Sequence, residues 1–306
     1  MPRFIAPRAP VLHTSGNLTP LLTMQTRRNF LATLGVATFG IAKGDSFACS
    51  PALTPARKID RVGLQLYTVR DLMQADLPGT LAKVASIGYK EVEFAGYFGR
   101  SPAEIRSLLA QNGLTSPSSH VGYDSIGANW QKQLDDLKAI GHEWVTIAWM
   151  PEDQRNGIAD WKRHAAEFNK AGAAAKAAGL RFAYHNHDFE IRPLEGQRPL
   201  DVMLTETDPS LVDFEMDLYW VNFGGGNPID FFNRHPHRFP LVHVKDSGGP
   251  PDNKMVDVGS GTIQWPSIFA QSEKAGIQHY FVEHDQPADP IATITNSYRY
   301  LHNVTF

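Results

Sequence analysis

The chain reads RFAYHNHDFE at residues 181–190, LVDFEMDLYW at 211–220, FPLVHVKDS at 239–247 and HYFVEHD at 279–285. Each stretch contains a short run of apolar, β-branched or aromatic residues, which is typical of a buried strand. A polar residue stands at or near the end of each run, and these four are His185, Asp217, His243 and Glu283. A loop and a helix-like stretch follow each run, so these strands are predicted to lie parallel in one sheet.

The same alternation extends along the chain from Arg61 to its end. Strands are predicted at residues 61–66, 91–94, 115–120, 144–149, 180–185, 211–217, 238–244 and 279–283. Helices are predicted at residues 77–87, 102–112, 130–140, 158–178, 200–205, 228–234, 265–275 and 290–303. Eight strand–helix units in about 245 residues have the length and order of a single-domain α/β protein, a (β/α)8 TIM barrel.

The predicted barrel occupies residues 59–306, preceded by an N-terminal extension at 1–48 and a linker at 49–58. An open, doubly wound sheet is the alternative arrangement of alternating strands and helices. It is disfavoured because Leu66-Tyr67-Thr68-Val69-Arg70, which follows the first strand, contains none of the glycines of a phosphate-binding loop.

The N-terminal extension is typical of a bacterial twin-arginine (Tat) export signal. An arginine pair at 27–28 precedes 13 uncharged residues at 30–42, a run too short for a transmembrane helix, which needs about 20 apolar residues. Ser46 and Ala48 are the small residues of a cleavage site at 46–48, so we expect the Tat translocase to deliver a protein that begins at Cys49 to the periplasm. The alternatives are a chance arginine pair, a true start at Met24, and lipid attachment at Cys49.

The composition narrows the class of protein. The chain has 306 residues, of which 42% are hydrophobic and 20% charged, as in ordinary globular proteins. Its net charge of -3 lacks the strongly basic balance of nucleic-acid-binding domains, so nucleic acid is not an expected partner. Cys49 is the only cysteine, which excludes a disulfide bond within the chain.

The four strand-end residues predict a metal site. Parallel barrel strands deliver their C-terminal ends to one mouth, where the active sites of TIM barrels lie. Two histidines and two carboxylates converging there suit a divalent ion such as Mn²⁺ or Zn²⁺. Each residue alone could equally form a hydrogen bond or cap a loop, but one such residue on each of four successive strands is hard to explain by capping.

Four motifs resemble the xylose-isomerase-like TIM barrel superfamily: Phe214-Glu215-Met216-Asp217, His243-Val244-Lys245-Asp246-Ser247, Asp257-Val258-Gly259-Ser260-Gly261 and Val282-Glu283-His284-Asp285. That superfamily includes sugar phosphate isomerases and epimerases, ketose 3-epimerases, inosose dehydratases and endonuclease IV. The resemblance implies one divalent metal ion held by His185, Asp217, His243 and Glu283. His187 is an alternative to His185, because both side chains lie on the same side of an extended strand.

The resemblance also implies an acid–base mechanism. Ketose 3-epimerases use two metal-bound glutamates, one that removes a proton beside a carbonyl and one that returns a proton to the opposite face. This chain keeps only Glu283 of that pair, since histidine stands at the strand-five position. His187 could take the second role because the pKa of histidine lies near neutrality. Lys245 could stabilise an oxyanion, or instead form a salt bridge with Asp246 or Asp217.

Further residues at the strand ends are predicted to contact substrate. Glu93 ends the second strand and His120 the third, although either could instead tie down a loop. Trp149 and Trp220 could stack on the apolar face of a sugar ring. Trp220 stands where endonuclease IV and the epimerases often carry a histidine, which argues against a trinuclear zinc cluster and against DNA repair.

The sequence therefore predicts a metal-dependent sugar isomerase or epimerase that abstracts a proton next to a carbonyl and passes through an enediolate. Mn²⁺ is the first choice of metal, with Zn²⁺, Co²⁺ and Mg²⁺ open. The alternative is a lyase or dehydratase that performs β-elimination on a 3-keto sugar, a 3-keto glycoside or an inosose, because both reactions begin with the same proton abstraction. A third hypothesis is a non-catalytic periplasmic sugar-binding barrel, and a homo-oligomer is compatible with all three.

Overall fold

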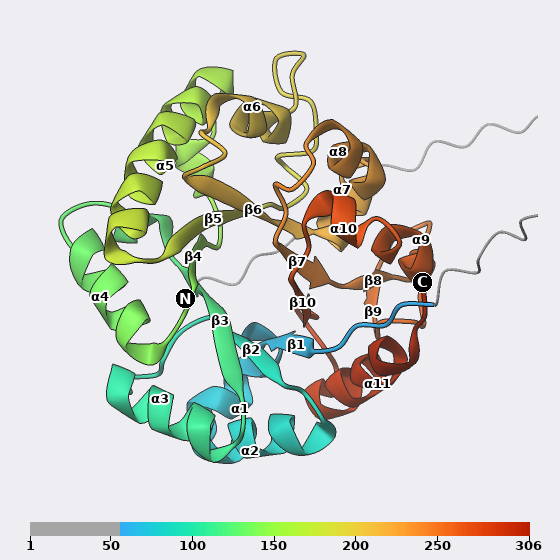
Figure 1. The fold of residues 1–306 in the computed structure, drawn as a ribbon. Coiled ribbons are helices and arrows are strands. Elements are labelled where there is room, and N and C mark those ends of the chain that lie inside the picture. Colours follow the sequence, from blue (N-terminus) through green and yellow to red (C-terminus); the bar gives the residue numbers. More distant parts are fainter. Residues whose placement is uncertain (1–55) are drawn as a thin grey trace, which may run out of the picture. The chain divides into compact units, whose positions relative to one another are not determined.

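The computed structural model describes residues 56–306, which form a closed parallel barrel surrounded by helices (Figure 1). Its strands are β1 (Val62–Gln65), β2 (Glu91–Phe94), β3 (Thr115–Val121), β4 (Trp144–Ile147), β5 (Arg181–His185), β6 (Val212–Asp217), β7 (Leu241–Val244) and β10 (His279–Val282). These eight pair in parallel in chain order, and β10 closes the barrel on β1. The predicted TIM barrel is confirmed, and the open doubly wound alternative is wrong.

Helices cover the outside of the barrel. They are α1 (Arg70–Ala75), α2 (Leu77–Ile87), α3 (Pro102–Gln111), α4 (Trp130–Ile140), α5 (Ile158–Ala178), α6 (Pro199–Glu206), α7 (Leu218–Phe223), α8 (Pro228–Arg234), α9 (Trp265–Phe269), α10 (Ser272–Ala275) and α11 (Pro290–Asn303). Local signals set their ends, as where Ser101 and Glu104 form a capping box at the start of α3. Gly141 ends α4 in left-handed backbone with a φ of 110°.

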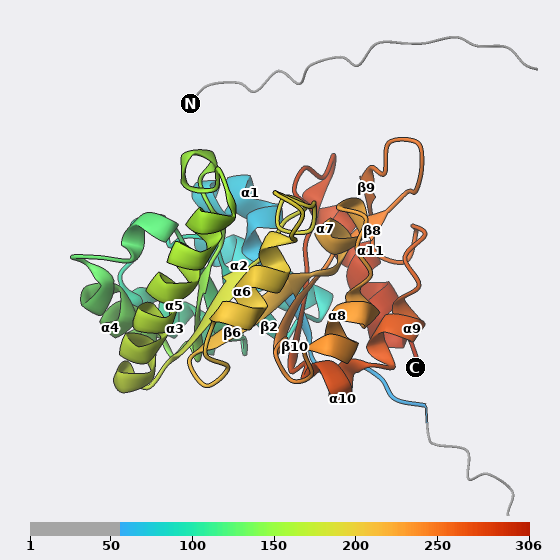
Figure 2. The same cartoon turned by 90° about the horizontal axis from the view of Figure 1, so that it is seen from above.

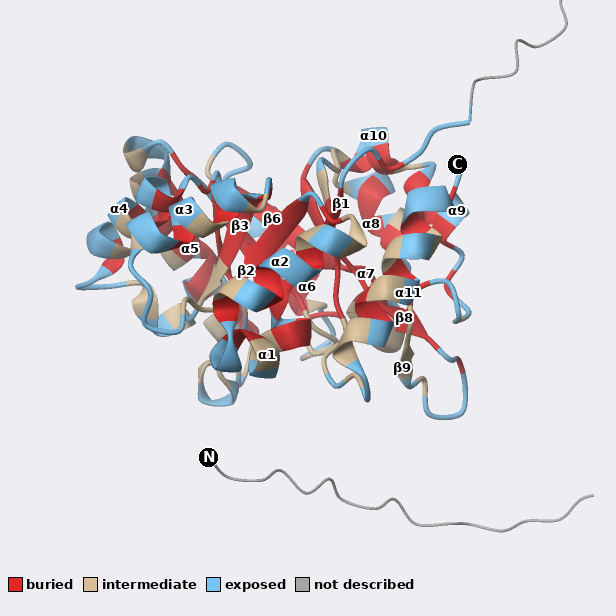
Figure 3. Ribbon diagram, turned by 90° about the horizontal axis from the view of Figure 1, so that it is seen from below, coloured by how far each residue is buried: buried red, intermediate tan, exposed pale blue. Residues whose placement is uncertain are grey.

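Alternation along the strands separates an outer core from the barrel interior. Outward side chains such as Leu64, Phe182 and Val242 join the helices in one large apolar cluster. Figure 3 shows the strands as buried and the outer faces of the helices as largely exposed. A separate small cluster lies inside the barrel, here called the apolar plug, and its members are Trp144, Ala183, Leu241 and Phe281. The plug makes the interior a packed core.

Two short helices that follow strands closely were not predicted from the sequence. Gln65, the last residue of β1, accepts a hydrogen bond from the Tyr67 N–H through its side chain and so starts the 3-10 turn that leads into α1. Asp217, the last residue of β6, caps α7 in the same way, because its Oδ1 accepts from the Trp220 N–H. With six residues each, α1 and α7 are too short to show a helical repeat in the sequence.

The connection after β7 also departs from prediction. It carries a two-stranded antiparallel ribbon, β8 (Asp246–Ser247) and β9 (Met255–Val256), at the end of the barrel opposite the C-terminus (Figure 2). The Asp246 carboxylate fixes this connection by accepting hydrogen bonds from the Gly259 N–H and from Trp265 Nε1, both at 2.9 Å. The helix predicted at residues 265–275 is divided into α9 and α10.

The two ends of the described chain meet at the barrel. Arg57 and Phe306 exchange backbone hydrogen bonds of 2.8 and 3.0 Å, so this part of the predicted linker is held in place. The predicted export signal and its cleavage site lie outside the described residues. Among residues 56–306, no helix combines the length and hydropathy needed to cross a bilayer.

Candidate active site

Ionisable residues gather at the C-terminal ends of the strands, on one side of the apolar plug. They are Glu93 in β2, His120 in β3, His185 in β5, Glu215 and Asp217 in β6 and His243 in β7, with Lys245 and Glu283 just past the ends of β7 and β10. Residues two apart on a strand point to the same side, so the strands deliver these side chains to the interior together. All except the partly exposed His120 are buried.

Three of the four predicted metal ligands form a compact group. Ligand atoms of Asp217, His243 and Glu283 all lie within 4.8 Å of one another, and His243 Nδ1 is 2.7 Å from Glu283 Oε2. His185, the fourth, places its Nε2 at 3.6 Å from Asp217 Oδ2. The structure therefore brings all four to the same mouth, with His185 reaching the group from the Asp217 side.

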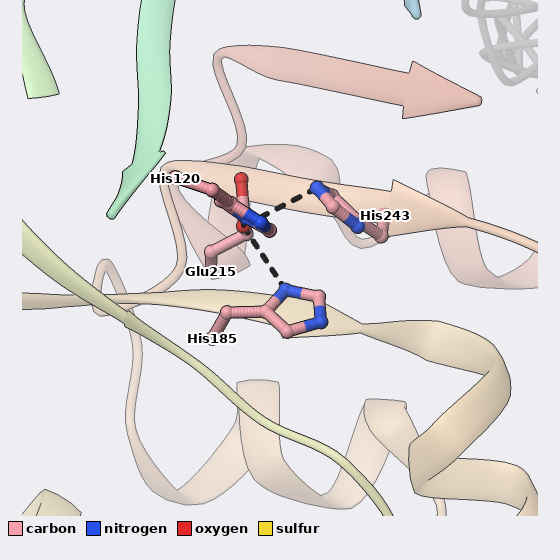
Figure 4. A group of neighbouring side chains, drawn as sticks. All are labelled: His120, His185, Glu215 and His243. Atoms are coloured by element: carbon pink, nitrogen blue, oxygen red, sulfur yellow. Dashed lines mark hydrogen bonds and ion pairs between the residues drawn. The ribbon is translucent and has the colours of Figure 1, made fainter. Parts of the chain in front are cut away.

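A second group surrounds Glu215, a residue without a predicted role. His120 Nε2, His185 Nδ1 and His243 Nε2 lie 2.6, 3.0 and 3.2 Å from one oxygen atom, Glu215 Oε2. Figure 4 shows the three rings converging on this carboxylate, and the four residues also offer ligand atoms within 4.8 Å of one another. The available sequence signal is spacing, because Glu215 precedes Asp217 by two residues and so shares its side of β6.

Lys245 carries a positive charge into the centre of the site. Its Nζ lies 2.7 Å from Glu283 Oε2, 2.7 Å from Asp285 Oδ1 and 2.9 Å from Asp217 Oδ2. Asp246, a predicted alternative partner, is occupied with the connection after β7. The ammonium group is thus held among three carboxylates, one from β6 and two from just past the end of β10, the strands on either side of β7.

Burial and nearby charges shift the pKa values of these groups. Burial opposes the charge of Glu283, but Lys245 and His243 beside it bring its pKa well below the usual range. Burial outweighs Lys245 at Asp217 and raises the pKa of that carboxyl to about 6. Burial, with the nearby His243 adding to it, lowers the pKa of His185 to about 3. A neutral imidazole is the form that binds a metal ion.

The donor atoms of the mouth fit a divalent metal ion. Within the described residues, one buried oxygen each of Glu93 and Glu215 and the Nδ1 of His187 make no hydrogen bond. Leaving a buried polar atom without such a partner costs roughly 1–3 kcal/mol, and coordination to a metal ion offsets that cost. Imidazole nitrogen and carboxylate oxygen together suit several divalent ions. These residues can therefore hold a divalent ion, but they do not determine which metal it is.

Glu93 was predicted to contact substrate, but it lies below the surface of the mouth. Its side chain is completely buried, and its Oε2 is 2.7 Å from both Gln65 Nε2 and His243 Nε2. That position favours a role in orienting His243. His120 lines the mouth cavity while it contacts Glu215, so a contact between His120 and substrate stays a prediction.

A cavity of about 460 Å³ opens at this mouth. The predicted site residues that line it are His120, Trp149, His185, His187, Lys245 and Glu283. Trp220 does not line it, because its ring packs behind the site, 5.8 Å from Lys245 Nζ and 5.7 Å from the ring of His187. Of the two tryptophans predicted to stack on a sugar, only Trp149 is placed to reach a ligand.

Glu190, a second residue without a predicted role, fixes the loop after β5. Its buried carboxyl group accepts a hydrogen bond of 2.8 Å from the His187 N–H and another from the Tyr184 hydroxyl. Burial raises the pKa of Glu190 to about 8. Loops lack the periodicity that marks buried positions in helices and strands, so the sequence alone offers no signal for this contact.

Comparison with known proteins gives a consistent picture. A model of the xylose isomerase-like TIM barrel family matches residues 81–302. An inosose dehydratase from Geobacillus kaustophilus is 23% identical over 205 residues, which are 56% of this chain and 65% of that enzyme, just under two thirds of its length.

Solved structures extend the comparison. A sugar phosphate isomerase/epimerase from Parabacteroides distasonis is 28% identical with a TM-score of 0.70, and the match covers 80% of this chain and 98% of that one. The IOLI protein, solved with a zinc atom, has a TM-score of 0.62 over 78% of this chain and 95% of its own, but at 14% identity it shows the fold alone.

Proposed function

Because this chain belongs to the xylose isomerase-like TIM barrel family, we propose that it is a metal-dependent lyase or dehydratase that acts on a cyclic keto sugar. The contact of 2.7 Å between Lys245 Nζ and Glu283 Oε2 carries this proposal. β-Elimination needs a base for the proton next to a carbonyl and an acid for the departing oxygen. Glu283 and Lys245 supply both from adjacent strand ends, and the likeness to inosose dehydratases supports the same chemistry.

Glu283 and Lys245 can carry out every proton transfer of the reaction and return to their starting protonation states. Glu283 accepts the proton as the C–H bond next to the carbonyl breaks and a C=C bond forms. The C–O bond on the adjacent carbon breaks, and Lys245 donates a proton to the departing oxygen. The proton on Glu283 then passes to Lys245, which restores both groups. The three carboxylates overcome burial and raise the pKa of Lys245 well above its usual range, so it begins the cycle protonated.

The same mouth would hold the metal. Asp217, His243 and Glu283 are the ligands we propose, with His185 approaching from β5. When bound, a divalent ion polarises the substrate carbonyl. Mn²⁺ remains our first choice, with Zn²⁺, Co²⁺ and Mg²⁺ as alternatives.

An isomerase or epimerase is the second candidate, favoured by the 28% identical isomerase/epimerase structure. Such an enzyme would return a proton to carbon in place of expelling a group. His187 is the residue suited to that step, since it lines the cavity and its Nδ1 makes no hydrogen bond within the described residues. The similar proteins are enzymes, which disfavours the non-catalytic sugar-binding hypothesis.

Proton NMR in D₂O distinguishes these reactions. The Mn²⁺-loaded protein is incubated with a panel of inososes and 3-keto sugars, and the chelator-treated protein serves as the control. We expect deuterium at the carbon next to the carbonyl, followed by loss of water or an alcohol. A product of equal mass would favour the isomerase, and no exchange by the metal-bound protein would contradict both candidates.

We also propose export to the periplasm by the Tat translocase, on the strength of the arginine pair at 27–28 and the uncharged run that follows it. Cell fractionation of a strain that expresses the full chain measures export. Replacing both arginines with lysine keeps the charge and should retain the protein in the cytoplasm. Unchanged export of that variant would contradict the proposal.

A further inference from the structure

A second hollow adjoins the mouth cavity. Its volume is about 550 Å³, and it shares Gly122, Ala148 and Trp149 with the first cavity of about 460 Å³. Both volumes fall within the range of roughly 300–1,000 Å³ typical of small-molecule sites. Trp149 therefore borders two contiguous spaces, each with room for a ligand.

Packing alone does not account for the position of Trp149. The residue follows β4 and is 44% exposed, although large apolar side chains are normally buried. Its ring is nevertheless held in place, since the Phe189 ring packs against it edge-on at a centroid distance of 6.4 Å and the Arg155 guanidinium lies 5.7 Å from its centroid. An exposed ring that is already held loses little freedom when a ligand stacks on it.

The second hollow offers groups that recognise hydroxyls. Asp124, Asp153 and Gln154 line it together with the ring of Tyr123. Their carboxylates and amide are exposed or half-buried and so are open to a ligand. No lysine or arginine is among the residues of the described chain that line this hollow. Carboxylates without a cation repel phosphate and other anions, so the hollow suits a neutral group.

We propose that the substrate has two units, a keto sugar ring in the mouth cavity and a second neutral sugar ring in the hollow beyond Trp149. The apolar face of the second ring stacks on the indole, and its hydroxyls donate to Asp124 and Asp153. The substrate class is thus a neutral keto glycoside, an inference that rests on the proposed function and deepens it.

A glycoside also supplies the leaving group that elimination requires. Glu283 takes the proton from the ring carbon between the carbonyl and the glycosidic carbon, and a C=C bond forms there. The C–O bond that joins the two units breaks, and its oxygen receives the proton of Lys245. The second unit leaves as an alcohol, and the first becomes an unsaturated keto sugar.

Binding measurements test the second hollow without turnover. Calorimetric titration of the metal-loaded full chain compares methyl α-glucoside with maltose, cellobiose and trehalose. We expect at least one disaccharide to bind about tenfold more tightly than the methyl glucoside, the size of one stacking contact. Trp149→Ala and Asp153→Ala should each reduce that preference. Glu152→Ala, on the same turn but outside both hollows, is the matched control and should keep it.

Three binding results would overturn the inference. They are equal affinity of the wild type for all four sugars, no binding of any of them, and a full disaccharide preference in Trp149→Ala. The first two results would mean that the hollow does not bind a second sugar ring. The third would mean that the ring of Trp149 is not the surface on which that sugar stacks.

Turnover separates failure of this inference from failure of the proposed function. The 3-keto forms of methyl glucoside and of the preferred disaccharide are compared by deuterium exchange and product analysis. We expect kcat/KM to be about tenfold higher for the disaccharide and to fall toward the methyl glucoside value in Trp149→Ala. Elimination from both at equal kcat/KM would overturn the two-unit substrate and keep the function. Exchange with neither would overturn the function, whatever the binding preference.

Discussion

The two ends of the barrel interior bury charge in different ways. At the N-terminal end of the strands, each carboxylate faces a cation that reaches solvent. Asp213 lies 2.7 Å from Arg181 and accepts a hydrogen bond of 2.9 Å from Trp144 Nε1. Glu91 lies 3.0 Å from Arg61. Both arginines are about half exposed, so only the carboxylate of each pair is taken out of water.

At the C-terminal end, the charges and their partners are buried together. Glu215, Asp217 and Glu283 are enclosed, and so are the residues that face them, His243 and Lys245. Removing such ions from water costs several kcal/mol each before their attraction offsets it. One carboxylate oxygen of Glu215 still makes no hydrogen bond in the described chain. This end of the barrel therefore carries a cost in stability, which is expected of a reactive site.

Glu283→Gln, at the C-terminal end of the strands, should have the largest effect on activity and a much smaller effect on stability. The amide keeps the shape of the side chain and removes the proposed base, so the rate of deuterium exchange should fall about 10²–10⁴-fold. The free energy of unfolding should change much less, because Lys245 keeps Asp217 and Asp285 as partners. NMR exchange and calorimetry measure the two effects. Exchange within about tenfold of wild type would remove Glu283 from the role of base.

Glu215→Gln tests whether the missed carboxylate prepares the metal site. One of its two carboxylate oxygens, Oε2, contacts the imidazoles of His120, His185 and His243. Losing the charge that orients ligands of this kind lowers metal affinity about 10–100-fold. Competition with a chromogenic chelator measures affinity for Zn²⁺ and Mn²⁺ without any substrate. Asp213→Asn, two residues earlier on the same strand, is the matched control, and equal affinity in both variants would mean that the imidazoles are oriented without Glu215.

Most of the fold was predictable because its elements carry their own local signals. The bounds predicted for α2, α4, α5, α8 and α11 are those observed, since each of these helices is marked by a periodic apolar face, a capping residue, a proline at its start or a glycine after its end. The helices α1 and α7 were not predicted because each has only six residues and follows a strand closely, where one strand-end side chain, Gln65 or Asp217, starts the turn.

The site was predictable only where a residue ends a strand. Asp217, His243 and Glu283 stand at or within one residue of such ends, and the structure brings them together. Glu215 lies one step earlier along the interior, where the strand pattern alone does not distinguish a paired carboxylate from a reactive one. Glu190 acts through a loop backbone, and Glu93 is bonded to a histidine five strands away in chain order. Such long-range contacts exist only after the barrel closes.

Asp213→Asn, at the N-terminal end of the strands, should lower the stability of the fold and leave the deuterium-exchange activity unchanged. The variant weakens hydrogen bonds to Arg181 and to Trp144, so the free energy of unfolding should fall by about 1–3 kcal/mol. The mouth lies on the other side of the apolar plug, so exchange per folded molecule should keep the wild-type rate. Urea denaturation and NMR measure the two. A loss of exchange larger than the loss of folded protein would mean that the two ends are coupled.

Glu190→Gln gives the most specific effect, because Glu190 shows a third way to bury a carboxyl group. Burial raises its pKa from 4.5 to about 8, so between these pH values the native state keeps a proton that the unfolded state has released. Its contribution to stability is complete below pH 4.5 and is lost as the pH rises to about 8, by up to about 1.4 kcal/mol per pH unit. When the free energy of unfolding is measured by urea denaturation from pH 5 to pH 8, it should fall less with pH for Glu190→Gln than for the wild type. Tyr184→Phe keeps the carboxyl group and should keep the fall, whereas parallel curves for wild type and Glu190→Gln would show that Glu190 is charged in the folded protein.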